Sequence, residues 1–275
     1  MPPIGILTKN RAAYLDVTLR SLSATDIPAG VSVTVFDDAS TDAATLQYYR
    51  KSGTTKLAYN TWPQDSRWQA LGLGQLPTGK LEQASIGDKI HVHRAKRPAG
   101  VVKASCTAIR SMLESSSAAG VFLLQDDVVF NADWYHRMLR TVAESTNFTE
   151  RPIGVLAGLK LNHTLWPEAG KLAVPSGITA QCLYISRQAA ECVDFLTNPP
   201  NVTKRFDDLL RRAVTKAGLW GGVIYPFVCQ HIGVKSLVRP GKRWGTGKAA
   251  RVGLYSHPPY TMSDSVRSFR DSRDE

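Results

Sequence analysis

Cysteine is scarce in this sequence. The four cysteines are widely spaced, and no two of them form the short-spaced pair that structural zinc sites use. They are most simply explained as thiols of a hydrophobic core. The sequence therefore predicts no zinc-binding module. The four positions are Cys106, Cys182, Cys192 and Cys229.

Long hydrophobic runs are also absent. No apolar stretch approaches the roughly 20 residues of a membrane-spanning helix, and the first residues, MPPIGILTKNR, lead into strand-like sequence without a signal-peptide pattern. These absences predict a soluble cytoplasmic protein without a membrane span. Three Asn-x-Thr triplets, at Asn147, Asn162 and Asn201, would instead be glycosylation acceptors if the chain were a luminal fragment without its anchor.

Acidic residues are fewer than basic ones. The 275 residues include 34 Lys and Arg against 23 Asp and Glu, which gives a net charge of +11. This balance favours an anionic partner, such as a nucleotide, a nucleic acid or an acidic membrane surface, without choosing among them. The imbalance is sharpest between Lys235 and Arg251, a stretch rich in basic residues that contains no acid.

Short strands alternate with helical segments along much of the chain, and this alternation predicts an α/β fold with a mostly parallel sheet. Strands are expected at residues 3–8, 31–36, 89–93, 121–124 and 182–185, and helices at residues 11–22, 101–113, 187–196 and 207–217. Between residues 54 and 88 the periodicity fails, so we expect an insertion there, either a partly ordered loop or a lid. The length fits one large domain, alone or with an appendage.

Two adjacent carboxylates, Asp126 and Asp127, follow the apolar strand at 121–124 and precede a helical segment. Adjacent like charges repel and resist burial, so a solvated turn is the simplest interpretation. The alternative is a cation held between the carboxylates and a ligand, because functional groups collect at strand ends in open α/β sheets. The strand at 31–36 likewise ends in Asp37 and Asp38. The residues alone leave both interpretations open.

Four stretches, in order, resemble nucleotide-sugar-dependent glycosyltransferases of the GT-A fold, with family-2-like and N-acetylglucosaminyltransferase-like motifs. They are ILTKNRAAYLDVTLRSL, VFDDASTD, QDDVVFNADWYHRM and FDDLLRRAVTKAG, and the resemblance that they carry extends over most of residues 3–236. The resemblance implies a Rossmann-like α/β fold with a central, mostly parallel sheet flanked by helices. It also implies a GT-A domain over residues 1–236, followed by a basic C-terminal lid or tail over residues 237–275.

The resemblance further implies a metal-dependent, inverting transfer of a sugar from a nucleoside-diphosphate sugar, with UDP-sugar favoured, to an acceptor hydroxyl. A divalent cation, Mn²⁺ or Mg²⁺, would stabilise the charge of the diphosphate leaving group. The residues expected to bind the nucleotide sugar are Thr8, Arg11, Asp37, Asp38, Lys103, Gln125 and Asp126. Gln125 departs from the pattern, since relatives often carry an acid there, and this departure implies weak metal affinity.

The resemblance assigns Asp127 as the direct metal ligand. It assigns His231, within CQHIGVKS, as the histidine that completes the metal shell. Without the resemblance, a single histidine more often belongs to the core or a loop.

Asp208, with Asp207 beside it, matches the position of the catalytic base that takes the proton from the acceptor. Without the resemblance, the pair would be interpreted as carboxylates at a helix N-terminus, which the helix dipole stabilises. Their order and spacing relative to QDD favour the catalytic role.

The favoured acceptor is a 5-hydroxymethylpyrimidine in DNA, as in phage-type DNA-modifying glycosyltransferases, which would place the protein in the host cytoplasm. The net charge and the basic segment fit a polyanionic acceptor. A glycan, lipid-linked or protein acceptor is the second prediction. A nucleotide-sugar-binding protein without turnover, suggested by Gln125 alone, is the third. The segment could contact the acceptor, close as a lid, or be a solvated tail, through Lys242, Arg243, Trp244 and Arg251.

Overall fold

The structure is a computed structural model, and it describes residues 1–50, 91–145, 149–159, 173–175, 178–192, 205–224 and 227–231. The expected insertion at 54–88 and the predicted basic C-terminal lid or tail at 237–275 lie outside the described residues. The predictions for Lys242, Arg243, Trp244 and Arg251 therefore fall on parts of the chain that the structure does not describe.

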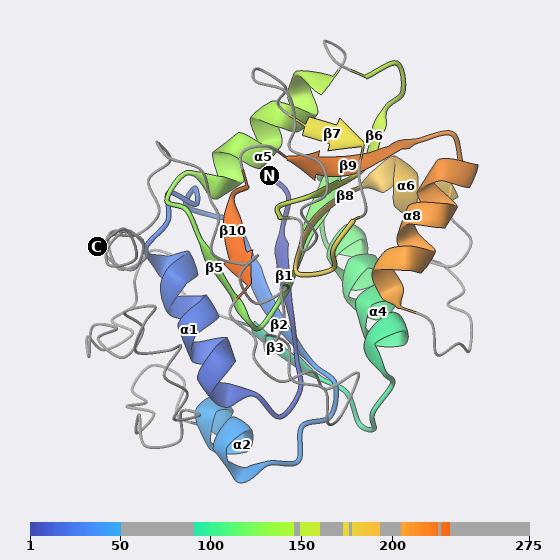
Figure 1. The fold of residues 1–275 in the computed structure, drawn as a ribbon. Helices are drawn as coiled ribbons and strands as arrows, with labels where there is room; N and C mark the ends of the chain where they lie inside the picture. The colour runs from blue at the N-terminus through green and yellow to red at the C-terminus, as the bar shows by residue number, and fades with distance from the viewer. Residues whose placement is uncertain are drawn as a thin grey trace, which may run out of the picture.

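The described residues form an α/β fold around an eight-stranded sheet (Figure 1) with the order β3-β2-β1-β4-β8-β6-β9-β7. Strands β7 and β8 are antiparallel to their neighbours, and the other strands run in one direction. The mostly parallel sheet expected from the sequence is therefore confirmed. The strands are β1 (Ile4–Thr8), β2 (Val33–Asp37), β3 (His91–Arg94), β4 (Gly120–Gln125), β6 (Ile153–Ala157), β7 (Ala173–Pro175), β8 (Cys182–Ser186) and β9 (Trp220–Ile224).

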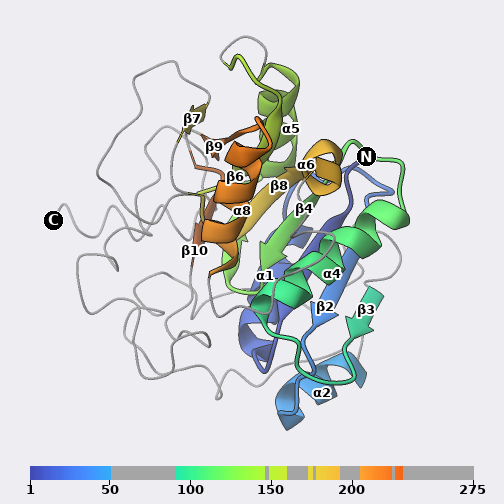
Figure 2. The ribbon, with the colours of Figure 1, turned by 90° about the vertical axis from the view of Figure 1, so that its right-hand side faces the viewer.

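Helices cover both faces of this sheet (Figure 2). One face packs against α1 (Ala12–Ser23) and α5 (Trp134–Ala143), and the other against α4 (Val101–Glu114), α6 (Arg187–Cys192) and α8 (Phe206–Lys216). A further helix, α2 (Ala43–Arg50), follows β2. None of the helices that the structure describes combines the length and hydrophobicity that a transmembrane span requires.

Strand β4, at the centre of the sheet, contributes side chains to the core layers on both faces. Phe122 and Leu124 belong to the core layer that includes α1 and α5, whereas Val121 and Leu123 belong to the layer under α4, α6 and α8. All four side chains are fully buried. A strand covered on both faces needs a continuous apolar run rather than an alternating one. The run in β4 therefore carries the chain through the core and delivers Asp126 at its end.

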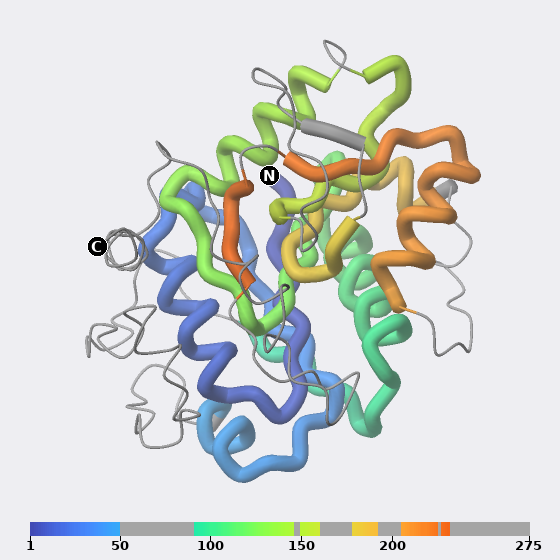
Figure 3. The backbone as a smooth tube through the Cα atoms, viewed as in Figure 1, coloured from blue at the N-terminus to red at the C-terminus, as the bar shows by residue number. Residues whose placement is uncertain are grey.

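A small second sheet joins distant parts of the chain. Strand β5 (Val128–Phe130) pairs antiparallel with β10 (Cys229–His231), and His231 lies opposite Val128. The backbone trace shows β10, in orange, lying beside β5, in the green segment that follows β4 (Figure 3). Neither strand was predicted, because three residues are too few to show a period.

Three of the four cysteines are buried free thiols, as expected from their spacing: Cys106, Cys182 and Cys229. Cys182 begins β8 and Cys229 begins β10, and both lie against Gly158, which follows β6. A Cβ atom added at Gly158 would lie 2.7 Å from the Cys182 sulfur and 3.1 Å from the Cys229 sulfur. The missing side chain of Gly158 thus makes room for both thiols where these three segments meet.

Candidate functional site

Polar residues gather where the parallel strands β1, β2 and β4 end. In the strand register, Thr8 lies opposite Asp37, and Leu7 lies opposite Gln125. The carboxyl ends of neighbouring parallel strands share one edge of a sheet, which is where ligands bind in open α/β folds. The structure thus brings Thr8, Asp37 and Gln125, three residues of the predicted site, to one edge of the sheet.

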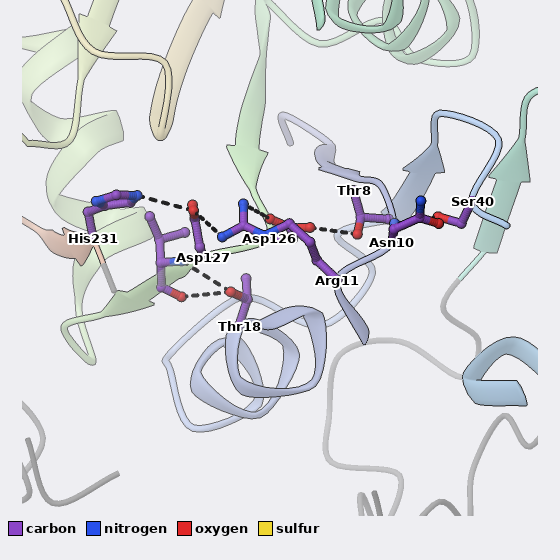
Figure 4. A network of polar contacts seen from close by, with 9 residues as sticks. Thr8, Asn10, Arg11, Thr18, Ser40, Asp126, Asp127 and His231 are labelled. Carbon is purple, nitrogen blue, oxygen red and sulfur yellow. Dashed lines mark hydrogen bonds and ion pairs between the residues drawn. The ribbon is translucent and has the colours of Figure 1, made fainter. Parts of the chain in front are cut away.

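Asp126 and Asp127, directly after β4, are both buried, with 2% and 3% of their surface exposed. The interpretation as a solvated turn is therefore wrong. The guanidinium of Arg11 contacts both carboxylates, with Nη1 2.9 Å from Asp126 Oδ1 and Nη2 2.7 Å from Asp127 Oδ2 (Figure 4). The Arg11 guanidinium also stacks over the ring of Tyr14, 4.2 Å from the ring centroid. In this structure the positive charge that compensates the two acids is the guanidinium of Arg11.

His231 lies on the other side of Asp127. Its Nε2 is 3.1 Å from Asp127 Oδ2, the same oxygen that accepts the hydrogen bond from Arg11 Nη2 (Figure 4). The pairing of β10 with β5 produces this contact, since His231 lies opposite the residue after Asp127. The structure thus brings together the two residues that the resemblance assigned to a metal.

Two threonines hold the turn that carries the acids. The hydroxyl of Thr8, the last residue of β1, donates to Asp126 Oδ2 at 2.6 Å. Thr18 of α1 donates its hydroxyl to the Val128 carbonyl at 2.9 Å and accepts a hydrogen bond from the Val128 amide at 3.2 Å. Both backbone groups of Val128 are therefore tied to one side chain, which fixes the position of Asp127 immediately before it.

Burial and charge act differently on the two acids. Burial raises the pKa of Asp126, and the nearby charge of Arg11 offsets this effect only in part. Burial also acts to raise the pKa of Asp127, but the charge of Arg11 and the contacts of Arg11 and His231 with the carboxylate outweigh it and hold that pKa well below its usual range. The pKa of Arg11 is raised, because its attraction to both acids exceeds the opposing effect of burial. Asp127 is therefore the firmly ionised member of the pair.

The loops after β1 and β2 are joined by side-chain hydrogen bonds. The side-chain oxygen of Asn10, Oδ1, accepts hydrogen bonds from the backbone amides of Thr41 and Asp42 at 2.7 and 3.1 Å. The backbone amide of Asn10 donates a hydrogen bond to Ser40 Oγ at 2.8 Å. Ser40 in turn donates both its backbone amide and its hydroxyl to Asp37 Oδ1, at 2.9 and 2.5 Å. Asp37 is thus an internal part of this loop structure as well as a predicted ligand-binding residue.

Asp38 connects the same loop to the beginning of α4. Its carboxylate accepts hydrogen bonds from the amides of Ala99 and Gly100, at 2.5 and 3.1 Å, and lies 3.3 Å from Lys9 Nζ. Lys103 is exposed on the first turn of the same helix. Asp38 therefore fixes the backbone just before α4, through two amides that precede the first turn of the helix.

Several residues of this edge were not predicted from the sequence. They are Asn10 and Ser40, which join the two loops, Thr18, which holds the turn after Asp127, and Arg94, whose Nε lies 3.4 Å from Asp37 Oδ2. Asn10 adopts a positive φ of 52°. Asparagine tolerates this conformation better than most residues, so its place in a loop after a strand was a usable signal.

The contacts of Asp127 and His231 fit a divalent cation. Two neighbouring ligands of an octahedral ion with bonds of about 2.1 Å lie about 3 Å apart, close to the observed 3.1 Å between Oδ2 and Nε2. Asp127 Oδ1 is buried and has no hydrogen-bond partner among the described residues. Among the residues that the structure describes, no three His, Cys, Asp or Glu side chains lie close enough together to hold a metal ion. An ion held here would need phosphate or water as further ligands.

Asp207 and Asp208 begin α8, which packs against β6, β9 and α4. Asp207 is half-buried, and burial raises its pKa, whereas Asp208 is exposed. Asp207 Oδ1 accepts a hydrogen bond from the Asp208 amide at 3.1 Å. The contacts described for this pair are local to the helix start, so its catalytic role stays a prediction.

Solved structures resemble this chain in fold. S. aureus TarS 1-349 in complex with UDP-GlcNAc superimposes with a TM-score of 0.52 at 14% sequence identity, covering 98% of this chain and 72% of that one. This likeness shows the GT-A fold that was expected from the sequence. No protein-family model matches the sequence, and no curated protein matches it.

Two further structures are similar at a lower level. They are S. aureus TarS 1-349 without a named ligand, at 18% identity over 83% of this chain, and the mannosyltransferase PcManGT from Pyrobaculum calidifontis in complex with GDP-Man and Mn²⁺, at 16% identity over 86%. Both have a TM-score of 0.49. The chain spans 59% of the first and 57% of the second.

Proposed function

We propose that this protein is a glycosyltransferase that transfers a sugar from a nucleoside-diphosphate sugar to an acceptor hydroxyl. One observation carries the proposal. A buried pair of acids follows the central strand of a GT-A fold, and its second member, Asp127, lies 3.1 Å from His231. The pair lies at the edge of the sheet where open α/β folds bind their ligands, and this position favours a functional role.

Asp127 and His231 would hold a divalent cation, Mn²⁺ or Mg²⁺. When bound, such a cation supplies positive charge that stabilises the diphosphate leaving group. Thr8 and Thr18 support this site by fixing the turn on either side of Asp127. Gln125 contributes no charge, so the cation would rely on the phosphates of the donor for much of its binding.

The loops after β1 and β2 would receive the nucleotide, with UDP as the favoured carrier. Asn10, Ser40 and Asp37 hold these loops in one arrangement through their hydrogen bonds. A loop that is already ordered loses less entropy when it binds a ligand. Asp38, directly after β2, and Lys103, on the first turn of α4, would complete the nucleotide-binding residues.

Asp208, supported by Asp207, would accept the proton of the acceptor hydroxyl in an inverting transfer. A carboxylate within reach of the acceptor hydroxyl can take its proton as a general base. Burial raises the pKa of the neighbouring Asp207. The exposure of Asp208 leaves it open to an incoming acceptor.

The acceptor we favour is a 5-hydroxymethylpyrimidine in DNA, on the basis of the net charge of +11. A polyanionic acceptor gains affinity from Lys and Arg through counterion release. Residues Lys242, Arg243, Trp244 and Arg251 would provide contacts to it. A glycan, lipid-linked or protein acceptor is the alternative.

The test is to incubate the purified protein with a panel of nucleotide sugars and Mn²⁺, in the presence of plain or hydroxymethylated DNA. We expect one donor to release its nucleoside diphosphate, and we expect chelator to stop the release. Sugar attached only to hydroxymethylated DNA would support that acceptor. Donor turnover without any DNA product would favour the alternative acceptors. If no donor binds or turns over, the proposed function is wrong.

A further inference from the structure

The two acids after β4 are already neutralised in part by the chain itself. One guanidinium, that of Arg11, spans Asp126 and Asp127 at 2.9 and 2.7 Å, and the Arg11 side chain is only 13% exposed. The planar fork of an arginine suits two acceptors at once and holds its charge at all physiological pH values. Arg11 is therefore an internal counter-ion of this acid pair.

The same oxygen that binds Arg11 also faces the proposed metal site. Asp127 Oδ2 lies 2.7 Å from Arg11 Nη2 and 3.1 Å from His231 Nε2. A divalent cation between Oδ2 and Nε2 would sit beside the guanidinium, where burial makes the repulsion of like charges strong. The guanidinium and the divalent cation would therefore both be attracted to the carboxylate of Asp127.

We propose that Arg11 competes with the divalent cation for Asp127, and that Arg11 gives up this contact when cation and nucleoside diphosphate bind together. This inference rests on the proposed function. A guanidinium leaving a carboxylate needs another anionic partner, and a phosphate matches its donor geometry best. The nucleotide thus supplies both ligands for the cation and a replacement partner for Arg11.

This arrangement makes cation and nucleotide binding cooperative. Without nucleotide, the cation must displace Arg11 from Asp127 and leave a buried guanidinium with one partner fewer. With nucleotide, the phosphates relieve both costs. Two ligands that favour the same state strengthen each other's binding by the same factor, typically between about 5- and 150-fold. Arg11 is therefore a positioning residue that sets how strongly the cation depends on the nucleotide.

The competition is tested by titrating Mn²⁺ into the purified protein and following free Mn²⁺ by electron paramagnetic resonance, with and without UDP. The variants are Arg11→Met, which removes the charge, and Arg11→Lys, which keeps the charge but loses the fork. Arg20→Met is the matched control, because Arg20 pairs with Asp16 on α1, at 2.8 Å, rather than with the acid pair. Circular dichroism verifies that each variant is folded.

We expect Arg11→Met to bind Mn²⁺ roughly 10-fold more tightly than the wild type in the absence of UDP. We also expect UDP to strengthen Mn²⁺ binding less in Arg11→Met than in the wild type. Arg11→Lys should be intermediate, and it gives the answer if the methionine variant does not fold. Arg20→Met should match the wild type.

Two results would overturn the inference, and they differ in what else they overturn. If the wild type binds Mn²⁺ with UDP, but neither Arg11 variant gains affinity without UDP, then Arg11 does not compete and the proposed function stands. If no form of the protein binds Mn²⁺ with or without UDP, the metal site itself is wrong, and the inference falls with it.

Discussion

Arg11 and Asp127 are 116 residues apart in the sequence, yet Arg11 Nη2 donates a 2.7 Å hydrogen bond to Asp127 Oδ2. This contact ties the loop after β1 to the turn after β4. It compensates the charge of a carboxylate that is almost completely buried. Without such compensation, two adjacent acids would be very costly at the end of a central strand.

Conservative substitutions can distinguish the catalytic roles of Asp208 and Asp207. If Asp208 is the base, Asp208→Asn should lower turnover by roughly 10²-fold or more and leave donor binding unchanged, because asparagine keeps the shape but not the basicity. Asp207→Asn should have a smaller effect on turnover. The measurement is the rate of nucleoside diphosphate release with acceptor present. Equal rates for Asp208→Asn and wild type would show that the base lies elsewhere.

Replacing Ala39 with glycine should make the fold more stable. It adopts a φ of 56°, in the left-handed region that a Cβ atom disfavours, between the two predicted ligand-binding acids and Ser40. Ala39→Gly should raise the free energy of unfolding by about 0.5–1 kcal/mol, because the relieved strain exceeds the entropy that glycine adds to the unfolded chain. Urea denaturation measures this change. Ala108→Gly, within α4, is the control and should lower stability by about 1 kcal/mol or more; a loss at Ala39 of the same size would contradict the assignment of strain.

Gly158 should not tolerate a side chain. Gly158→Ala would bring a Cβ atom to 2.7 Å from the Cys182 sulfur, so we expect a loss of about 1–3 kcal/mol of stability from overpacking. Gly221→Ala is a matched control, since its nearest contact would be 3.3 Å from Ile178 Cδ1. Chemical denaturation compares the two.

The thiol itself can be removed to test this cause. Adding Cys182→Ala to Gly158→Ala should recover part of the lost stability, so the two effects should not be additive. Additive losses would show that the Cys182 sulfur is not what excludes a side chain at Gly158.

Asp16 should make stability depend on pH. It is buried in α1, Arg20 contacts one of its oxygens, and the other has no hydrogen-bond partner among the described residues. Burial raises the pKa of Asp16 and Arg20 offsets this only in part. The folded protein thus binds this proton more tightly than the unfolded chain, so Asp16 costs stability as pH rises from about 4, its value in the unfolded chain, through its folded pKa.

Asp16→Asn does not titrate, so its stability relative to wild type should increase between about pH 3 and pH 7. Denaturation at both pH values gives this difference. A difference that is independent of pH would show that the carboxyl of Asp16 has the same pKa in the folded and unfolded states.

Much of the fold was predictable because strands and helices leave periodic signals. The apolar run before Asp126 indicated a buried strand, and helix α1 was recognised from the spacing of residues such as Leu15, Leu19 and Leu22. Strands β5 and β10 were missed, since three residues show no period. Their pairing is long-range, and it is what carries His231 to Asp127.

The site was only partly predictable for a related reason. Arg11 was expected to bind the nucleotide, but its contact with both acids depends on the sheet register between β1 and β4. Asn10 and Ser40 act through backbone amides of another loop, so residue type alone did not single them out. Asp207 and Asp208 were assigned by resemblance, and their role stays a prediction.

The most direct measurement is the affinity for UDP with and without Mn²⁺, by calorimetry, in the wild type and in Asp127→Asn. If Asp127 holds a cation that bridges to the diphosphate, Mn²⁺ should strengthen UDP binding by roughly 10-fold or more in the wild type and have little effect in the variant. Circular dichroism should show that the variant is folded. A wild type whose UDP affinity ignores Mn²⁺, or a variant with the same dependence on Mn²⁺ as the wild type, would contradict this account of the site.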